Sequence, residues 1–387
     1  MKKIRVLFPY VEAGYGHIMP MKSIEETFRR KYGDRVEVVH SEFYTEAGDK
    51  HMIKYEQMLA NQVRTYNRFP PVGYLAAGTS DIFGTSVSSF ASMRFSAPIA
   101  CSRAIEHMRE LDADVVFSTH WATNYYAEKL EKKPLTVMYC PDARLYKLFR
   151  YKCDLCLISM PYGYLKALRS GRYDRENLKL VPFLIRNEAF DICRDKKQVR
   201  RDLGLPENNF TVVLAEGGYG IGKMGQICEL LIKEHLPLTV IPVCGTNRKL
   251  FEHLSSLKST DEVTFRPYAF TERILELEAA SDVFCGKSGN ILAEATFFGC
   301  LSIVTHFANF IERYIADHYI NTVGCAIKEF SPQKTVELIK KFAADDSALE
   351  PYRRAALDYH ENFGSEKAAD VLWETIVKRF PELEKSK

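Results

Sequence analysis

The sequence predicts an α/β protein built from two doubly wound, Rossmann-like parallel-sheet domains that face a crevice. Three observations support this fold class: the length of 387 residues, the alternation of strand-like with helix-like segments, and a restart of that alternation halfway along the chain. Single domains mostly stay below about 250 residues, so the length argues for two hydrophobic cores. Strands that alternate with helices form parallel sheets covered by helices on both faces.

The first series consists of six short apolar runs separated by segments with a helical period. The runs, which are typical of buried strands, lie at 4–10, 35–41, 113–119, 135–140, 154–159 and 178–183. Residues 42–100 interrupt the series with amphipathic, aromatic-rich sequence. We expect this insertion either to pack as helices and loops or to line a lipid groove.

The second series has five strand-like runs, followed by a purely helical end. The runs lie at 210–216, 238–244, 262–268, 281–287 and 300–306, and helices are expected between them and at 331–344, 351–363 and 366–380. Residues 185–197 have neither period, which indicates a boundary there. We therefore predict an N-terminal domain of residues 1–190 and a C-terminal domain of residues 191–387 that includes the terminal helices.

Composition is that of an ordinary folded protein, with 46% hydrophobic and 27% charged residues. No run approaches the roughly 18 consecutive apolar residues of a membrane span, and no cleavable signal follows Met1. We therefore expect a cytoplasmic protein that associates with membranes only at their surface. Ten cysteines are too few for a disulfide scaffold, so we expect free thiols, and Cys153 and Cys156 are expected to be structural.

Charge is distributed unevenly along the chain. Residues 1–190 hold 28 Lys and Arg against 21 Asp and Glu, whereas the remainder holds 25 against 29. The excess is concentrated between Arg144 and Arg186, after Asp142, and is expected near the mouth of the crevice. Such a patch suits phosphates or an anionic membrane surface, and a solvated face without a partner is the alternative. No nucleic-acid partner is expected.

A glycine-rich segment, Ala13-Gly14-Tyr15-Gly16-His17, follows the first strand. Ligands bind to open parallel sheets beyond the carboxyl ends of the strands. A helix begins here, so His17 is expected at the mouth of the crevice, where a neutral imidazole can take a proton from an attacking hydroxyl. Helix capping is the alternative role for His17.

A second glycine-rich segment, Gly217 to Lys223, follows the first strand of the second domain and leads into a helix. Backbone N–H groups and the helix start suit a diphosphate. The segment also mimics a nucleotide-triphosphate loop, but Met224 stands where that loop has Ser or Thr to bind Mg²⁺, which argues against a triphosphatase.

The third motif, at 285–304, reads strand, turn, helix, strand. Lys287 and the helix start at Ser288-Gly289 can bind phosphate oxygens, and the carboxylate of Glu294 can accept hydrogen bonds from both hydroxyls of a ribose. The alternative is a glycine-containing helix start with a solvated Glu294.

These motifs resemble the MurG-like branch of the GT-B glycosyltransferases, and in particular the monogalactosyl- and monoglucosyl-diacylglycerol synthases. The resemblance covers nearly the whole chain, and its most specific part is the KxG…AEA element at Lys287 to Ala295. The other matching segments are 14–17, 69–74, 117–120, 140–142, 217–222 and 244–250.

The resemblance implies the positions of the donor and the acceptor. It places His17 as the general base near the acceptor hydroxyl, and Asp142 as a support on the acceptor side. The other acceptor-side residues are Gly16, His120 and Tyr74. The donor-binding residues that it implies are Gly218, Gly220, Gly222, Gly245, Asn247, Phe270, Lys287, Ser288, Gly289, Asn290, Glu294 and Glu312, with Glu294 on the ribose and Phe270 near the uracil.

Two segments depart from the family pattern. Where the family holds the donor sugar with PGQExxN, this chain keeps the acid as Glu312 but has Ile315 in place of Asn. After the TD element, Tyr146 and Phe149 stand where the family has His and Trp.

The predicted function is transfer of a hexose from a UDP-sugar to a lipid hydroxyl, of the diacylglycerol kind, at a membrane surface, with inversion. Helix starts and Lys287 would neutralise the departing UDP, so neither a metal nor a cofactor is expected. Two alternatives stay open: a transferase that acts on a soluble acceptor, and a sugar-nucleotide-binding or epimerase-like protein that forms no glycoside.

Overall fold

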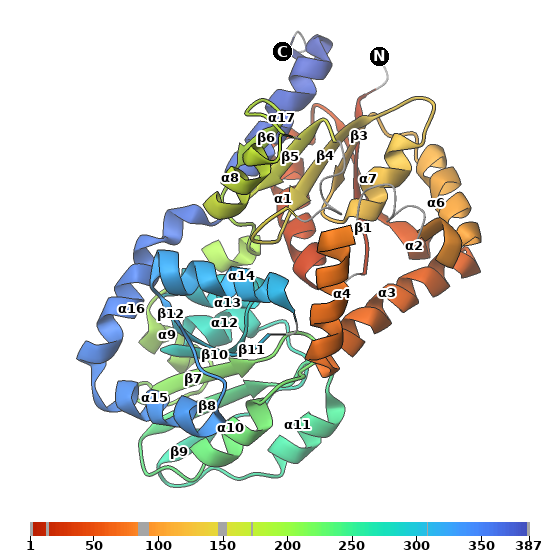
Figure 1. Cartoon of the computed structure of the whole chain (residues 1–387). Helices are drawn as coiled ribbons and strands as arrows, with labels where there is room; N and C mark the ends of the chain where they lie inside the picture. The colour runs from red at the N-terminus through yellow and green to blue at the C-terminus, as the bar shows by residue number, and fades with distance from the viewer. Residues whose placement is uncertain are drawn as a thin grey trace. The chain divides into compact units, whose positions relative to one another are not determined.

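Two six-stranded parallel sheets, each covered by helices, form the framework of the protein (Figure 1). The computed structural model describes residues 3–12, 15–83, 93–145, 153–171, 173–307 and 309–384. The chain divides into two compact units: the first contains residues 1–65, 72–187 and 364–387, and the second contains residues 66–71 and 188–363. The predicted fold class, two doubly wound α/β domains, is confirmed.

The sheet of the first unit has the strand order β2-β1-β3-β4-β5-β6. Every neighbouring pair is parallel, as the alternation with helices requires. The strands are β1 (Arg5–Tyr10), β2 (Glu37–Glu42), β3 (Val115–Ser118), β4 (Leu135–Cys140), β5 (Leu155–Ile158) and β6 (Leu178–Leu180). Its helices are α1 (Tyr15–Tyr32), α2 (Phe43–Glu46), α3 (Lys50–Arg68), α4 (Pro70–Phe83), α6 (Pro98–Glu110), α7 (Trp121–Glu128), α8 (Pro161–Arg169) and α17 (Glu366–Arg379).

The sheet of the second unit has the order β12-β11-β10-β7-β8-β9. Its strands are β7 (Phe210–Ala215), β8 (Leu238–Val243), β9 (Val263–Phe265), β10 (Val283–Lys287), β11 (Leu301–His306) and β12 (Ala326–Lys328). Its helices are α9 (Lys196–Asp202), α10 (Met224–Leu231), α11 (Arg248–Ser255), α12 (Ile274–Ala279), α13 (Asn290–Phe297), α14 (Phe310–His318), α15 (Pro332–Ala344) and α16 (Asp346–Asp358). The sequence did not predict β12, because its residues, unlike those of the equally short β6 and β9, do not belong to a longer strand-like run.

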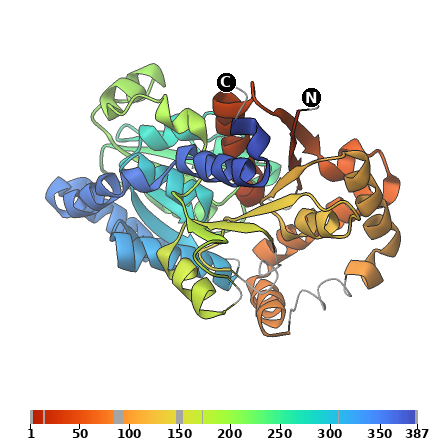
Figure 2. The same cartoon turned by 90° about the horizontal axis from the view of Figure 1, so that it is seen from above.

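The last helix, α17, does not belong to the C-terminal domain, contrary to the sequence prediction. Its apolar face packs against α1 and β4 of the first unit, and Figure 2 shows it beside the N-terminal elements. Trp373 stacks on Tyr32 with ring centroids 4.6 Å apart, and Ser365 lies 2.6 Å from Thr27 between their hydroxyl oxygens. The sequence analysis assigned α17 to the wrong domain because the pattern of an amphipathic helix does not show which of two hydrophobic cores its apolar face packs against.

The insertion at 42–100 packs as helices on one face of the first sheet. Phe43, Tyr44, Met52 and Tyr55 form a buried cluster with residues of β1, α6 and α7. On α3, the carboxylate of Glu56 accepts a hydrogen bond of 2.8 Å from the backbone N–H of Glu12, directly after β1. The helical alternative for this segment is therefore correct for its described part.

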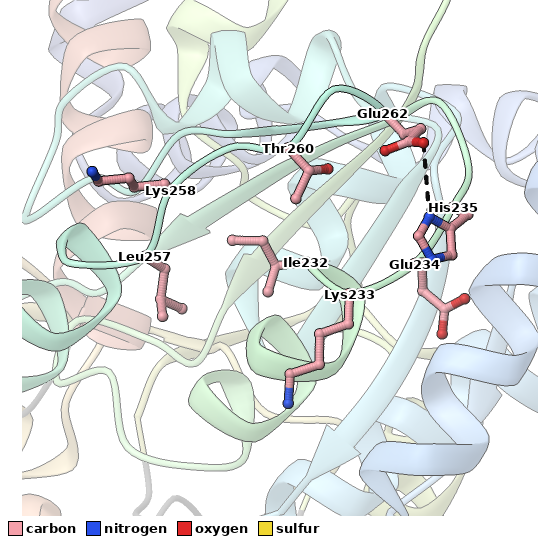
Figure 3. A pocket seen from close by; sticks show the side chains of 8 residues that line it. All are labelled: Ile232, Lys233, Glu234, His235, Leu257, Lys258, Thr260 and Glu262. Atoms are coloured by element: carbon pink, nitrogen blue, oxygen red, sulfur yellow. Dashed lines mark ion pairs between the residues drawn. The ribbon is translucent and has the colours of Figure 1, made fainter.

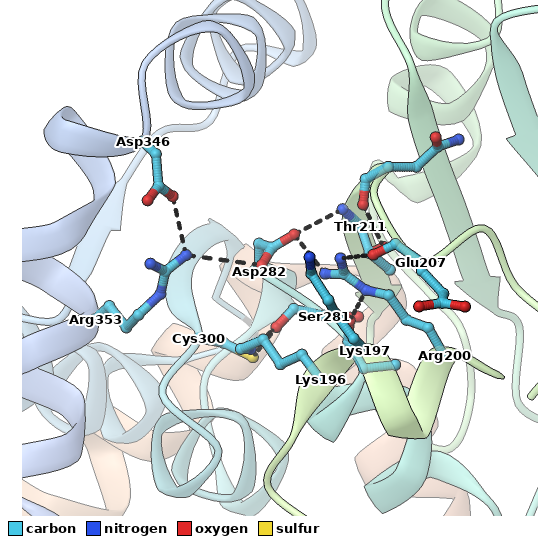
Figure 4. Close-up of polar contacts among 12 residues, drawn as sticks. Lys196, Lys197, Arg200, Glu207, Thr211, Ser281, Asp282, Cys300, Asp346 and Arg353 are labelled. Atoms are coloured by element: carbon cyan, nitrogen blue, oxygen red, sulfur yellow. Dashed lines mark hydrogen bonds and ion pairs between the residues drawn. The ribbon is translucent and has the colours of Figure 1, made fainter. Parts of the chain in front are cut away.

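A buried polar network ties α9 and α16 to the amino ends of β7 and β10 (Figure 4). Asp282 Oδ2 accepts hydrogen bonds from Arg200 Nη2 at 2.6 Å and from the backbone N–H of Thr211 at 2.9 Å. Arg200 also donates to the carbonyls of Ala280, at 2.8 Å, and Glu207, at 2.9 Å. The pair is buried, and both partners make further hydrogen bonds, which is the condition under which a buried charge is tolerated.

All ten cysteines are free thiols, as predicted, and nine of them are buried. Cys153 and Cys156 both lie in the core of the first unit, and burial raises the pKa of Cys156 well above its ordinary value. In the described ranges, no helix is long and apolar enough to cross a bilayer.

Candidate functional site

Three predicted residues of the first unit follow neighbouring strands at one edge of the sheet, which we call the first carboxyl edge. His17 follows β1, His120 follows β3 and Asp142 follows β4, and these three strands are adjacent. Because the carboxyl ends of parallel strands share one edge, the fold brings the three side chains to one region. Ala13, Gly14, Tyr146 and Phe149, as well as the Tyr15 side chain, lie outside the described residues.

His17 is held in one orientation and one tautomer. Its Nδ1 lies 2.8 Å from the carbonyl oxygen of Thr119, and the Thr119 hydroxyl donates back to the His17 carbonyl at 2.9 Å. A carbonyl only accepts hydrogen bonds, so Nδ1 carries the proton and Nε2 is the basic nitrogen. Burial lowers the pKa of His17 below 6.5, and the hydrogen bond to Thr119 opposes this only in part. The imidazole is therefore neutral at pH 7 and suited to accept a proton.

His120 has the opposite tautomer and a structural role. Its Nδ1 accepts a hydrogen bond of 3.3 Å from the N–H of Ala122 and so caps α7, which places the ring proton on Nε2. Its ring meets that of His17 edge-on, with centroids 5.4 Å apart. Burial, and then the neighbouring His17, hold the pKa of His120 well below 6.5. Helix capping, the alternative role for His17, is therefore observed for His120, which caps α7, whereas His17 is bonded to the Thr119 carbonyl.

The other acceptor-side residues lie after β4, at the start of α1 and on α4. Asp142 lies in the turn after β4, near Cys140 and Tyr139, whose pKa values its charge helps to raise. Gly16 is exposed on the first turn of α1, and Tyr74 is half-buried on α4. Their roles toward an acceptor stay predictions.

An Asp-x-Asp spacing at Asp112 and Asp114 lies at the opposite edge of the same sheet, before β3. Asp114 accepts a hydrogen bond from the N–H of Arg5 at 3.0 Å and pairs with Lys132 at 3.1 Å. These contacts join the amino ends of β1 and β3, which gives the spacing a structural role away from the first carboxyl edge.

In the second unit, the predicted donor residues all follow strands at one edge, the second carboxyl edge. They come after β7, β8, β9, β10 and β11, in the order Gly218 to Gly222, Gly245 and Asn247, Phe270, Lys287 to Glu294, and Glu312. The fold thus gathers at one edge of a single sheet the segments that the sequence assigned to the donor.

The two glycine-containing loops after β7 and β8 are locked together. The N–H of Thr246 donates to the carbonyl of Gly218 at 2.8 Å, and Asn247 Nδ2 donates to the carbonyl of Gly220 at 2.9 Å. Gly220 and Gly245 have φ values of 54° and 57°, and a Cβ on either would overlap the other loop's backbone. Gly245 and Asn247 therefore shape the loop after β7, and direct contact with a donor stays a prediction.

The start of α10 already holds a carboxylate, which the sequence reasoning missed. Glu216 directly follows β7 and is 2% exposed. Its Oε1 accepts hydrogen bonds from the N–H groups of Lys223, at 2.5 Å, and Met224, at 3.1 Å. A Cβ at position 222 would lie 2.2 Å from this oxygen, so Gly222 makes room for it. Glu216 therefore already bonds these two N–H groups at the start of α10, and contact of Gly218, Gly220 and Gly222 with a diphosphate stays a prediction.

Lys287, at the end of β10, pairs with Glu312 of α14, with Nζ 2.6 Å from Oε1. Lys287 also donates to Asn67, which belongs to the second unit. In the neighbouring strand the register partner of Lys287 is His306, whose Nε2 is buried and has no hydrogen-bond partner among the described residues. Burial lowers the pKa of His306. The sequence analysis did not predict His306 as a site residue, although a histidine at the carboxyl end of a strand could have indicated it.

The helix start after β10 differs from that of α10. Gly289 precedes α13 with φ 143°, and no side chain caps the helix there. Ser288 is buried and donates to the carbonyl of Glu312 at 2.7 Å, while Asn290 Nδ2 is buried without a partner in the described part of the chain. Glu294 is 2% exposed, so the alternative of a solvated Glu294 is wrong. Phe270, by contrast, is exposed.

A pocket of about 390 Å³ lies elsewhere in the second unit, where the loops before β8 and β9 meet (Figure 3). It is at the amino ends of these strands, opposite the second carboxyl edge. None of the predicted site residues lines it; the lining residues are Ile232, Lys233, Glu234, His235, Leu257, Lys258, Thr260 and Glu262.

The described basic residues of the stretch 144–186 do not all lie at the first carboxyl edge. Arg144 is buried, and the exposed Arg169 and Arg175 lie at the end of α8 and in the turn before β6. Because α8 runs back from the carboxyl edge, these two residues lie at the amino edge. The expectation that they line the mouth of the crevice is therefore wrong. Lys147, Arg150, Lys152 and Arg172 lie outside the described residues.

Sequence comparison identifies two groups of relatives. The processive diacylglycerol beta-glucosyltransferase of Bacillus subtilis (strain 168) is 27% identical over 240 residues, which cover 61% of each chain. Monogalactosyldiacylglycerol synthase 1 of Arabidopsis thaliana is 23% identical over 368 residues, which cover 89% of this chain and 64% of the relative. The chain thus spans less than two thirds of the length of the curated relatives it matches. No protein-family profile matches the chain.

Solved structures show the same fold at low sequence identity. MurG of Acinetobacter baumannii superposes with a TM-score of 0.61 at 12% identity, covering 96% of this chain and 99% of its own. The UDP-GlcNAc 2-epimerase of Neisseria meningitidis has a TM-score of 0.59 at 13% identity, covering 98% and 100%. These comparisons confirm the predicted resemblance: the chain has the GT-B fold of MurG-like proteins, and its sequence relatives include diacylglycerol glucosyltransferases and monogalactosyldiacylglycerol synthases.

Proposed function

We propose that this protein is an inverting glycosyltransferase that transfers a hexose from a UDP-sugar to the hydroxyl of a diacylglycerol-like lipid. The observation that carries the proposal is the tautomer of His17, which presents a basic Nε2 at the first carboxyl edge. The activities named for the two groups of relatives supply the substrate classes, a glycosyl donor and diacylglycerol.

The reaction follows from the roles assigned to the two edges. The acceptor oxygen attacks the anomeric carbon while its proton passes to His17 Nε2. The bond between that carbon and the diphosphate oxygen breaks, and the electron pair stays on the departing UDP. Lys287 and the uncapped start of α13 are the groups in the second unit suited to stabilise this charge. We propose that they act without a metal ion or a cofactor.

Two other functions make different predictions in one assay. A transferase for a soluble acceptor forms glycoside without vesicles, and an epimerase-like protein, whose fold this chain also shares, binds UDP-sugar without forming a glycoside. Incubation with UDP-glucose or UDP-galactose, either with diacylglycerol vesicles or with soluble alcohols as acceptors, separates the three functions. Glycolipid that forms only with vesicles supports the proposal, and its absence with both donors contradicts it.

We propose that exposed apolar side chains near the first carboxyl edge contact the membrane. We call this set of side chains the apolar edge. Ile99 lies at the start of α6 and Phe95 shortly before it, and Tyr162 and Leu165 lie in the first half of α8. Both helices begin at the carboxyl edge, because α6 ends before β3 and α8 follows β5. Val72 and Leu75 on α4 are exposed as well, Leu75 by 70% and Phe95 by 88%.

Burial of such side chains in a bilayer interface gives an apolar contribution that salt does not screen. The exposed Arg94, beside Phe95, adds an attraction to anionic lipid that is screened over roughly 8 Å at physiological salt. The proposed location of the protein is therefore the surface of an anionic membrane.

Vesicle sedimentation tests the apolar edge. The parent should bind anionic vesicles more strongly than neutral ones and keep a measurable part of its binding at high salt. Replacement of Leu75, Phe95 and Leu165 together by Ser should reduce binding about tenfold or more, since each buried large apolar side chain contributes about 1.5–3 kcal/mol. Replacement of Arg169 and Arg175 by Ser, at the opposite edge, is the matched control and should change little. Equal loss in both variants would contradict the proposal.

Calorimetry with UDP tests the donor half-site. Glu294→Ala should weaken UDP binding by roughly 2–3 kcal/mol, because charge-assisted hydrogen bonds to the ribose contribute about 1.5–3 kcal/mol. Glu294 is buried, so a thermal melt of each variant checks the fold, and Glu294→Gln serves as the variant of equal volume. If both variants bind UDP as tightly as the parent, Glu294 does not contact the ribose.

A further inference from the structure

The loop between β7 and α10 contains a carboxylate that the proposed reaction does not use. Glu216 is 2% exposed, and the N–H groups at the start of α10 are bonded to its Oε1 at 2.5 and 3.1 Å. A helix start is a natural site for an anion, so this side chain stands where a phosphate could otherwise bind. The loop thus keeps its shape without a ligand.

The second oxygen of the same carboxyl group has no such partner. Glu216 Oε2 is buried and has no hydrogen bond among the described residues. Burial raises the pKa of the thiols of Cys228, Cys244 and Cys285 above its ordinary value, and the nearby charge of Glu216 raises each of them further. A buried carboxylate oxygen without a donor is unfavourable, whereas a protonated oxygen in weakly polar surroundings is tolerated.

Two cations balance this charge in the absence of a ligand. Lys287, at the end of β10, and Lys223, before α10, both lower the pKa of Glu216, as do the two backbone hydrogen bonds. Burial is the larger effect and raises that pKa to about 7. Lys287 is also the residue expected to meet the diphosphate, so a bound donor removes part of the charge that compensates Glu216.

We propose that Glu216 is a positioning residue that holds the start of α10 in place of an anion and takes up a proton when the diphosphate of a UDP-sugar binds. The proton comes from solvent and goes to Oε2, so the helix start keeps its acceptor while the negative charge next to the diphosphate is removed. This inference rests on the proposed function, because it assumes a UDP-sugar at the second carboxyl edge.

The sign of the pH dependence follows directly. Below pH 7 Glu216 is largely neutral and the donor binds best; as pH rises through 7 the carboxylate ionises, repels the diphosphate and weakens binding. We expect the Kd of UDP-glucose or UDP-galactose to rise about five- to tenfold between pH 6 and 8.5, within the usual range of coupling between two sites. UDP-hexoses suit this test because, unlike UDP, they have no terminal phosphate that titrates in this range.

Variants separate Glu216 from its neighbours. In Glu216→Gln the Kd should stay constant from pH 6 to 8.5, near the value of the parent at pH 6, because a Gln oxygen still accepts from Lys223 and Met224. His306→Gln should keep the rise, since the lowered pKa of His306 confines its titration to below pH 6.5. Glu262→Gln, at the amino edge, is the matched control and should also keep it. If the Kd of Glu216→Gln still rises between pH 6 and 8.5, the proposal is overturned. This holds whether or not the variant also binds the UDP-hexose more weakly than the parent at every pH.

A measurement on the unaltered protein removes any dependence on the folding of the variants. Calorimetric titration at pH 7.5 in two buffers with different ionisation enthalpies should report an uptake of about half a proton for each UDP-hexose bound. Tight binding without proton uptake overturns this inference alone. No binding of either UDP-hexose at any pH overturns the proposed function, and the inference with it.

Discussion

Replacement of His17 by Ala should lower turnover by about two to four orders of magnitude while UDP affinity stays nearly unchanged. General-base catalysis supplies about 10²- to 10⁴-fold, and the residues expected to bind the donor all belong to the second unit. The structural reason is the 2.8 Å contact between Nδ1 and the Thr119 carbonyl, which fixes Nε2 as the basic nitrogen.

The pH profile provides a second measurement of the same assignment. His17 must be neutral to accept a proton, so activity should fall as pH drops through its pKa. Because burial holds that pKa below 6.5, the fall should begin below pH 6.5. His17→Gln, which cannot act as a base, should lose this acid limb together with most of the turnover.

His120→Asn is the matched control for these variants. Asn is a preferred N-cap residue, so it can replace the imidazole Nδ1 that caps α7. We expect its turnover to stay within about tenfold of the parent, because His120 has its ring proton on Nε2 and offers no basic nitrogen there. Turnover of His17→Ala within threefold of the parent would contradict the assignment, and Asp142 would become the candidate base.

The arrangement of strands was predictable from the sequence, but its details depended on packing. Buried strands such as β7 and β10 are short apolar runs between helical periods, so their existence and parallel pairing follow from the pattern. The three-residue β12 was not predictable in this way, because it does not belong to a longer strand-like run as β6 and β9 do. The place of α17 depends on which core accepts its apolar face, and this is a property of the tertiary structure.

The candidate site was predicted as a set of segments, but not as a set of contacts. The rule that ligands lie beyond strand ends places His17 and Lys287 correctly at the two carboxyl edges. It does not reveal that Glu216 fills the start of α10, because glycine spacing alone does not distinguish a loop around a ligand from a loop around a side chain. Arg169 and Arg175 were misplaced for a related reason: the sequence shows the number of charges, whereas the direction of α8 decides the edge at which these two lie.

Replacement of Arg200 by Met should destabilise the second unit by about 3–5 kcal/mol, the usual cost of removing one partner from a buried ion pair. Asp282 would lose the 2.6 Å contact with Arg200 Nη2, and the carbonyls of Ala280 and Glu207 would lose their donors (Figure 4). Arg353 lies 3.8 Å from the other oxygen of Asp282 and is partly exposed, so it compensates for only a small part of the loss.

The two units can be followed separately during urea denaturation. Both tryptophans, Trp121 and Trp373, belong to the first unit, so their fluorescence reports on that unit, whereas far-UV circular dichroism reports on both. In Arg200→Met the dichroism transition should move to lower urea. Arg353→Met is the matched control and should cost about 1 kcal/mol or less, because exposed ion pairs contribute little.

A double variant tests whether the cost arises from an unpaired buried charge. If Asp282 is the group left without its partner, Arg200→Met combined with Asp282→Asn should be less destabilised than the sum of the two single variants, by about 1 kcal/mol or more. Strict additivity, or a loss below 1 kcal/mol in Arg200→Met alone, would mean that the pair at the amino ends of β7 and β10 does not hold these strands together. In that case the stability of the second sheet would depend on its apolar core, in which Val212, Val283 and Leu301 are fully buried.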